Sequence, residues 1–219
     1  MSWLAPVSSG AALLPVCSFI TIQEEFMSQD LSSSHSVHVS RPLHGAHQVA
    51  LVLGGTAVLA ASSYVSIPMQ PVPVSLQTFA VLMVGALYGW RLGGLTVLAW
   101  LLEAAVGMPV LAGGKGGLAP FFGPTAGYLL AFPLGAILMG WLAARGGDGA
   151  HPLRAFLGML LCTTLILLMG GAWLAAMIGA AKGWQLGVLP FLIGDVVKSA
   201  LGAATLALWH LARTKLPRT

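Results

Sequence analysis

The stretch QVALVLGGTAVLAASSYVSIPMQPVPVSLQTFAVLMVGALYGW, residues 48–90, decides the fold, because it contains no Asp, Glu, Lys or Arg. A helix that crosses a membrane needs about 20 mostly apolar residues. The prolines within residues 68–73 must interrupt the run, since proline removes a backbone donor and clashes with the preceding helical turn. The stretch therefore predicts one membrane helix over residues 47–67 and a second over residues 74–89, joined by a proline loop.

The composition of the whole chain agrees with a lipid environment. Hydrophobic residues make up 57% of the chain and charged residues 7%, against roughly 25% charged residues in soluble domains. Ten Lys and Arg outnumber six Asp and Glu, but these basic residues are scattered singly and form no patch that would bind nucleic acid. We therefore expect an integral membrane protein surrounded by membrane lipid.

Further apolar runs follow the first two. Arg91 and the glycines around it indicate a turn, residues 107–123 form a glycine-rich loop, and polar turns are expected at residues 145–151 and 182–187. The second and third helices are short for a full span, so we expect them to tilt or to be partly buried. The predicted fold class is an all-α integral membrane bundle of six transmembrane helices, the last four running from Arg91 to residue 106 and over residues 124–144, 153–180 and 189–212.

Residues 1–45 differ from the rest of the chain. They are rich in Ser and His and show no sustained helical or strand period. The apolar segment at residues 11–22 is too short to span a bilayer. We expect a disordered or non-native N-terminal tail, with Met27 as a candidate start, followed by a membrane domain over residues 46–214.

The distribution of basic residues predicts the topology, because cytoplasmic loops carry an excess of Lys and Arg. In the six-helix arrangement seven basic residues fall on one side and two on the other, which places both termini in the cytoplasm. The proline loop and the glycine-rich loop then face outward together, at the end where a solute would enter. The larger set comprises Arg41, Arg91, Arg145, Arg154, Arg213, Lys215 and Arg218, and the smaller set Lys115 and Lys182.

Charges inside the membrane are costly, so each one is a candidate functional residue. Asp195 and Lys198 lie three apart on the sixth predicted helix and therefore share a face. They could form a structural ion pair that lowers the cost of insertion. They could also form a ligand site, in which the carboxylate accepts N–H bonds and the ammonium holds an anion. We favour the ligand site, because the pair faces the end at which the two loops gather.

Other polar residues near that end are weaker candidates. Lys115 is the only charge in the loop AGGKGG, in which Gly113, Gly114 and Gly116 let backbone N–H groups approach a ligand closely. Gln77 and Thr78 follow the proline loop, and their polar groups need partners, from a ligand or from the loop backbone. Glu103 lies near the outer end of the third helix, where a structural role and a ligand role are equally expected.

Metal, redox and enzyme chemistry are not predicted. The pairs His35/His38 and His44/His47 have a spacing that could bind a metal, but no Cys or carboxylate completes a ligand set. Cys17 and Cys162 lie in different surroundings and are expected to stay unpaired. No nucleophile and base are placed within reach of each other, so we expect no enzyme and no cofactor.

Small residues indicate helix-packing surfaces, and tryptophans indicate the membrane interface. Ala57 and Ala61 form one small-x-x-x-small pattern, and Gly85, Gly89 and Gly93 form another. Such patterns let helices approach closely in lipid, within the bundle or against another subunit. Five tryptophans fall near predicted helix ends, where indole rings favour the membrane interface; they are Trp90, Trp141, Trp173, Trp184 and Trp209.

Four ordered motifs resemble signatures of the BioY family, the biotin-specific substrate-binding S components of energy-coupling factor (ECF) transporters. They are PVPVSLQT (71–78), GMPVLAGG (107–114), GPTAGY (123–128) and GDVVK (194–198). The resemblance covers about residues 47–212. It departs from the family pattern at Met108, Leu111 and Ala126, where Leu, Phe and Gly are more usual; these mild changes could adjust the shape of the loops.

The resemblance implies an S-component fold with a biotin pocket near the outer face, roofed by the loops between helices 1 and 2 and between helices 3 and 4. It places Asp195 and Lys198 at ligand positions. Asp195 would accept from the ureido N–H groups, and Lys198 or Lys115 would hold the carboxylate; which end of biotin meets which charge stays open. Residues 113–117, Thr125 and Tyr128 would shape the pocket.

The resemblance also implies partners and a location. High-affinity biotin uptake across a bacterial cytoplasmic membrane would require a transmembrane coupling subunit and two ATP-binding subunits, since the chain has no Walker motif. Ala57 and Ala61 match the small-residue surface by which S components meet the coupling subunit. The alternatives are an S component for another vitamin, a solitary importer that works without the ATPases, and a structural scaffold. A homo-oligomer is left open.

Overall fold

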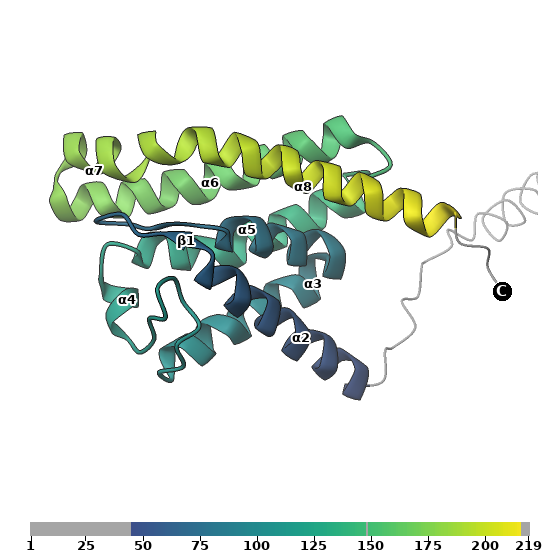
Figure 1. Ribbon diagram of the computed structural model, residues 1–219, viewed down its shortest axis with the longest axis horizontal. Coiled ribbons are helices and arrows are strands. Elements are labelled where there is room, and N and C mark those ends of the chain that lie inside the picture. The colour runs from purple at the N-terminus through teal and green to yellow at the C-terminus, as the bar shows by residue number, and fades with distance from the viewer. Residues whose placement is uncertain (1–44, 148, 216–219) are drawn as a thin grey trace, which may run out of the picture. The chain divides into compact units, whose positions relative to one another are not determined.

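The structure, a computed structural model, describes residues 45–147 and 149–215 (Figure 1). The predictions on the tail, including its histidines and Cys17, lie outside these residues. The elements are α2 (Gly45–Tyr64), β1 (Ser66–Ile67), β2 (Val74–Ser75), α3 (Gln77–Ala105), α4 (Ala119–Phe122), α5 (Ala126–Ala144), α6 (Pro152–Ile178), α7 (Ala180–Gly187) and α8 (Leu189–Lys215).

Helix α3 contains the second and third predicted membrane helices. Gly89 has φ 80° and ψ 171°, which no helix accommodates. On a straight helix Gly85 and Gly93 would be about 12 Å apart, yet a Cβ on Gly93 would lie 2.8 Å from the Cα of Gly85. The chain therefore reverses at Gly89. Five described segments are long and apolar enough to cross a membrane, and dividing α3 at Gly89 gives the six helices of the predicted bundle.

A short hairpin replaces the helix ends that were predicted around the prolines. Helix α2 ends at Tyr64 and α3 begins at Gln77, whereas the sequence predicted helix to residue 67 and again from residue 74. The difference arises because Ser66 pairs with Ser75 and Ile67 with Val74. The strands stop after two residues each, since the prolines between them have no N–H to continue the ladder.

The predicted turn at residues 182–187 is wrong, because α7 occupies these residues. Its glycines allow it to fold back along α6: Gly183 lies against the backbone of Ala175, and Gly187 against Leu174. Pro190 lacks the N–H that would continue α7 into α8, and its ring clashes with a continuous helix. The chain therefore breaks at Val188 and resumes as α8.

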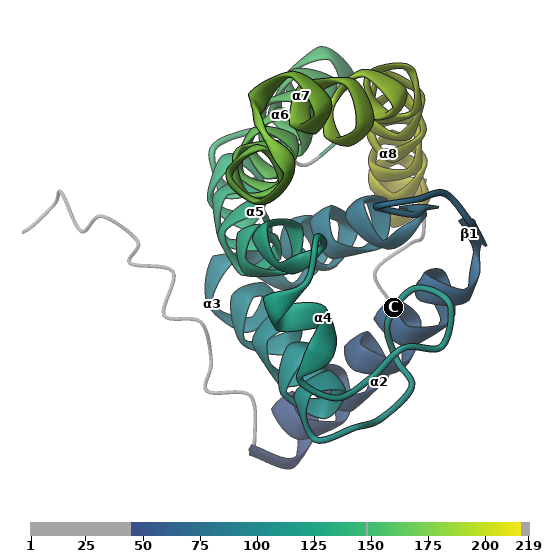
Figure 2. The same cartoon turned by 90° about the vertical axis from the view of Figure 1, so that its left-hand side faces the viewer.

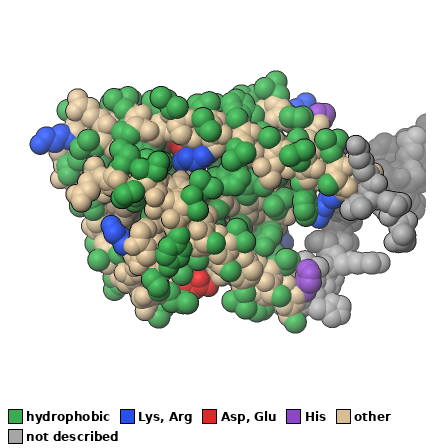
Figure 3. All heavy atoms as spheres, in the orientation of Figure 1, with side chains coloured by type: hydrophobic (Ala, Val, Ile, Leu, Met, Phe, Trp, Pro, Cys, Tyr) green, Lys and Arg blue, Asp and Glu red, His purple; other side chains and the backbone are tan. Residues whose placement is uncertain are grey.

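Helix α5 lies centrally and α2 at the edge. α5 packs on α3 and on α6, and α6 packs on α8 (Figure 2). The rings of Trp100 in α3 and Phe132 in α5 pack in this core at a tilt, with centroids 6.0 Å apart. Gly85 lies against the backbone of Ala136, so the glycine pattern of α3 serves internal packing. Helix α2 is the least buried of the spans. Hydrophobic side chains cover much of the face that Figure 3 shows.

Candidate functional site

A cavity lies between the hairpin, the glycine-rich loop and helices α3, α5, α6 and α8. Its wall is mostly apolar with a few polar groups, the pattern of a small-molecule site. The apolar lining is Val72, Pro73, Leu111, Ala112, Pro120, Leu129, Phe132, Ile166, Leu167 and Phe191. The polar lining is Ser75, Gln77, Thr78, Lys115, Thr125, Tyr128, Thr163, Asp195 and Lys198.

Asp195 and Lys198 form the charged part of the wall. The Lys198 Nζ donates to Asp195 Oδ1 over 3.0 Å, and the side chains are only 11% and 10% exposed. Burying two charges costs several kcal/mol per ion, and one ion pair repays this only in part. No other partner of these two groups occurs among the described residues. One carboxylate oxygen and two ammonium N–H groups therefore remain available to a ligand.

Gln77 is the polar centre of the opposite wall, and its amide is bonded to the protein at both ends. Its Nε2 donates to Ser63 Oγ over 2.8 Å, and its Oε1 accepts from Ser75 Oγ over 2.9 Å. Ser63 in turn donates to the carbonyl of Leu59. Gln77 thus ties the end of α2 to β2 while lining the cavity. The sequence did not indicate Ser63, since it lies 14 residues from Gln77 and on another element.

Tyr128 lines the cavity, but its hydroxyl proton already has a partner in the protein. Its hydroxyl donates to the carbonyl of Gly187 over 2.6 Å, and its ring lies 6.1 Å from that of Phe191. Any side chain at Gly170 would collide with this ring. Tyr128 therefore joins α5 to the junction of α7 and α8, a few residues before the charged pair.

The glycine-rich loop forms a roof through turns of its own backbone. The Leu111 N–H donates to the Lys115 carbonyl, and the Gly114 N–H to that of Leu111, each over 3.0 Å. Gly113 and Gly114 have φ of 73° and 69°, which glycine adopts without strain. The indole N–H of Trp100 holds the loop through the Val110 carbonyl. Neither these glycines nor Gly116 line the cavity, so they shape the roof rather than its inner surface.

The proline hairpin and the glycine-rich loop meet at the cavity mouth. A second, more open hollow is bordered by both loops, including Gly113, and shares Pro73, Ala112 and Lys115 with the main cavity. Lys115 is exposed and forms no ion pair among the described residues. The Tyr64 hydroxyl joins α2 to the same roof by donating to the Pro109 carbonyl over 2.7 Å. The two loops therefore cap one end, as predicted.

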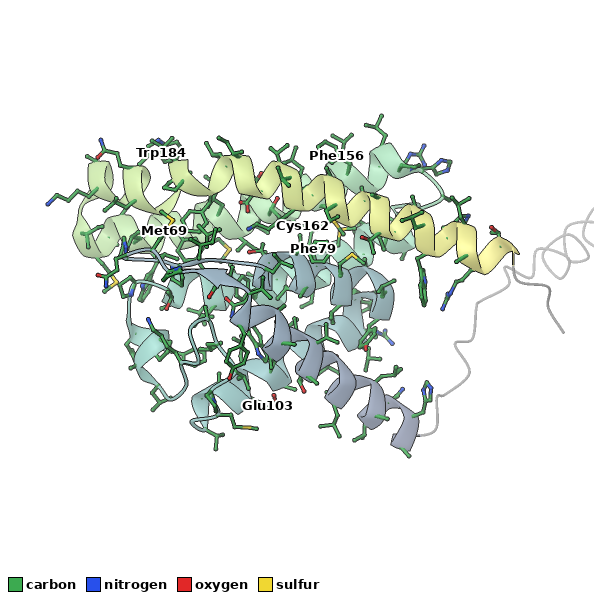
Figure 4. The ribbon with its side chains drawn as sticks, in the orientation of Figure 1. Met69, Phe79, Glu103, Phe156, Cys162 and Trp184 are labelled. Atoms are coloured by element: carbon green, nitrogen blue, oxygen red, sulfur yellow. The ribbon has the colours of Figure 1, made fainter. Side chains whose placement is uncertain are left out.

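Of the remaining predicted site residues, two line the cavity and one does not. Thr78 and Thr125 line the cavity, and Thr125 donates to the Pro120 carbonyl over 3.1 Å. Glu103 is not in the lining, and Figure 4 shows it far from Cys162, the neighbour of the lining residue Thr163. This position does not support the ligand role expected for Glu103.

Thr163 is a lining residue that the sequence did not indicate. Its hydroxyl lies 3.4 Å from that of Ser199, which follows Lys198 on α8. Both residues are buried. A hydroxyl within the apolar run of α6 is the signal that could have found it, because a buried hydroxyl needs a partner.

Comparisons with known proteins agree with this geometry. The sequence profile of the BioY family matches residues 33–215. A probable biotin transporter BioY of Pyrococcus horikoshii is 38% identical over 155 residues, 71% of this chain and 91% of that protein. The biotin transporter BioY of Rhizobium etli is 37% identical over 64% of this chain and 78% of that protein. The solved S component for biotin from an ECF-type ABC transporter matches with a TM-score of 0.68 and 27% identity, over 77% of this chain and 94% of that one.

Proposed function

Because this chain belongs to the BioY family, we propose that it captures biotin as the S component of an ECF-type importer. The observation that carries the proposal is the buried Asp195–Lys198 pair, which opens on an apolar cavity beneath two loops. A lone structural ion pair would need no cavity beside it. The relatives named as biotin transporters and the S component for biotin support the same substrate.

The chemistry of biotin fits the distribution of groups in the cavity. Its ureido ring carries two N–H donors and a carbonyl, its sulfur ring is apolar, and its valerate chain ends in a carboxylate. The available oxygen of Asp195 accepts a ureido N–H, and the ammonium of Lys198 or Lys115 holds the carboxylate. The apolar lining covers the rings and the methylene chain. Thr78, Thr125 and Thr163 add hydroxyl groups to the polar lining.

The likeness to an S component of an ECF-type ABC transporter supports a partnership with the other subunits of such a transporter. We expect a transmembrane coupling subunit and two ATP-binding subunits to complete the importer, and the sequence itself contains no Walker motif. Ala57 and Ala61 are exposed on α2, the least buried span, so another helix can approach closely there. The chain resides in the bacterial cytoplasmic membrane with both termini in the cytoplasm, and the two loops face outward.

Titration calorimetry on purified protein in detergent tests the substrate. Biotin should bind, and biotin methyl ester should bind at least about tenfold more weakly, because it lacks the carboxylate that the ammonium holds. Riboflavin and thiamine are the controls. Binding of one of them in place of biotin would support an S component for another vitamin, and absence of biotin binding would reject the proposal.

Radiolabelled uptake tests the partners. In cells that contain the coupling module, Ala57→Leu with Ala61→Leu should reduce uptake to a few per cent, since the larger side chains separate the helices. Calorimetry on the same variant should give unchanged biotin affinity. Undiminished uptake by the wild type in a host without the coupling module would instead identify a solitary importer.

A further inference from the structure

The end of the bundle opposite the cavity carries a repeated pairing of arginine with tryptophan. The Arg91 guanidinium lies 4.7 Å from the ring centre of Trp90, Arg145 lies 3.7 Å from Trp141, and Arg213 lies 4.9 Å from Trp209. The sequence spacing is one residue in the first pair and four in the others. The same contact therefore arises at three places in the chain from two different sequence spacings, so a single sequence repeat does not explain it.

These pairs belong to one end of the bundle. Gly140 of α5 lies against the backbone of Gly89 and Trp90, so the turn of α3 adjoins the end of α5. The Arg154 guanidinium lies beside Gly146, next to Arg145. Figure 1 shows the turn of α3, the connection from α5 to α6 and the last turns of α8 at the right-hand end, away from α4 and α7.

The guanidinium groups of these pairs are available to an anion. All three are exposed, and none forms an ion pair or side-chain hydrogen bond among the described residues. Stacking on an indole face holds a guanidinium in place while its N–H edge stays free, and that edge matches a phosphate group in two parallel hydrogen bonds. Among the described residues this end carries four arginines and no carboxylate, so its described part is net positive.

The surroundings identify the anion as a lipid headgroup. Trp90, Trp141 and Trp209 are each 41% to 48% exposed and lie at the ends of apolar spans, the depth at which indole rings meet phospholipid headgroups. The opposite end differs: there the Trp173 indole donates to the Gly123 carbonyl, and no arginine–tryptophan pair occurs among the described residues. We propose that the three arginine–tryptophan pairs bind the headgroups of anionic phospholipids and fix this end in the cytoplasmic leaflet.

Native mass spectrometry of detergent-purified protein with equimolar phosphatidylglycerol and phosphatidylcholine tests this proposal. The wild type should retain about fivefold more phosphatidylglycerol than phosphatidylcholine. The attraction of one basic residue to an anionic lipid surface corresponds to about this factor in binding. The variant Arg91→Gln/Arg145→Gln/Arg213→Gln should lose most of this preference, with only Arg154 of the four arginines left. The matched lysine substitutions should keep most of the preference, because they keep the charge. Lys182→Gln at the opposite end should keep all of it.

Size-exclusion chromatography establishes that each variant is folded. If the triple glutamine variant does not fold, Arg145→Gln alone should lower the preference to about half. An unchanged preference in the folded triple glutamine variant would overturn the proposal. So would an unchanged lipid preference combined with loss of assembly with the coupling subunits, which would identify the pairs as a protein interface. Biotin binding enters none of these outcomes, so the result is independent of the proposed substrate.

Discussion

The two polar walls of the cavity differ in how much of their hydrogen-bonding capacity is used. On the hairpin side, both ends of the Gln77 amide are bonded to Ser63 and Ser75. On the α8 side, Asp195 and Lys198 bond each other once and keep further acceptor and donor sites. Both walls line the same space, and the Gln77 amide keeps one N–H and one lone pair, yet only the α8 wall carries buried charges whose hydrogen-bonding capacity is mostly unused. Spare capacity, more than polarity, therefore distinguishes a ligand contact from a structural one.

The largest effects are expected on the α8 wall. Lys198→Ala and Asp195→Asn should each weaken biotin binding at least about tenfold in titration calorimetry, because each removes a charge that a ligand completes. Lys198→Ala should also bind biotin and biotin methyl ester with more similar affinity, provided that Lys198 holds the carboxylate. Wild-type affinity in both variants, with normal membrane insertion, would reject the site.

Gln77→Ala should have the next largest effect on biotin binding, because Gln77 holds the hairpin in position rather than contacting biotin. The substitution removes two hydrogen bonds, each worth about 1 kcal/mol, and loosens the hairpin over the cavity. We expect biotin to dissociate several times faster in stopped-flow measurements, while the preference for biotin over its methyl ester stays as in the wild type. Loss of that preference would place Gln77 with the ligand contacts and remove the difference between the walls.

Tyr128→Phe should reduce biotin affinity by about fivefold, the equivalent of one neutral hydrogen bond. The ring that fills the space beside Gly170 remains, but α5 loses its bond to the carbonyl of Gly187. Tyr64→Phe is the control, since it removes a tyrosine–carbonyl bond of similar length, 2.7 Å, at an exposed position in the roof. An equal loss of affinity in both variants would indicate a general loosening rather than positioning of α8 by Tyr128.

Lys115→Ala should have the smallest effect. This lysine is exposed at the mouth, where solvent and salt screen its charge. We expect a change in affinity of less than about threefold at physiological salt, arising mainly from slower association and vanishing at high salt. A tenfold loss that persists in high salt would make Lys115, rather than Lys198, the partner of the carboxylate.

The sequence predicted the charged wall well and the neutral wall poorly. Asp195 and Lys198 are three residues apart on one helix, so helical geometry alone placed them together. The Gln77 bond to Ser63 joins two elements, and no local pattern encodes it. The sequence left the role of Glu103 open, because an apolar run does not reveal which face of a membrane helix meets the cavity; the residue lies outside the cavity lining. Residues 182–187 looked like a turn, since their glycines indicate breaks, whereas tertiary packing of α7 on α6 uses them as close contacts.

The shortness of the hairpin of β1 and β2 limits aggregation between copies of the protein in a crowded membrane. An unpaired strand edge is a template on which a second chain can add a strand and start aggregation. Here each strand is two residues long, and the connecting segment contains Pro68, Pro71 and Pro73. Such an edge has too few N–H groups to recruit a neighbour. The segment that covers the cavity can therefore stay open to solvent at high protein density without joining one copy to the next.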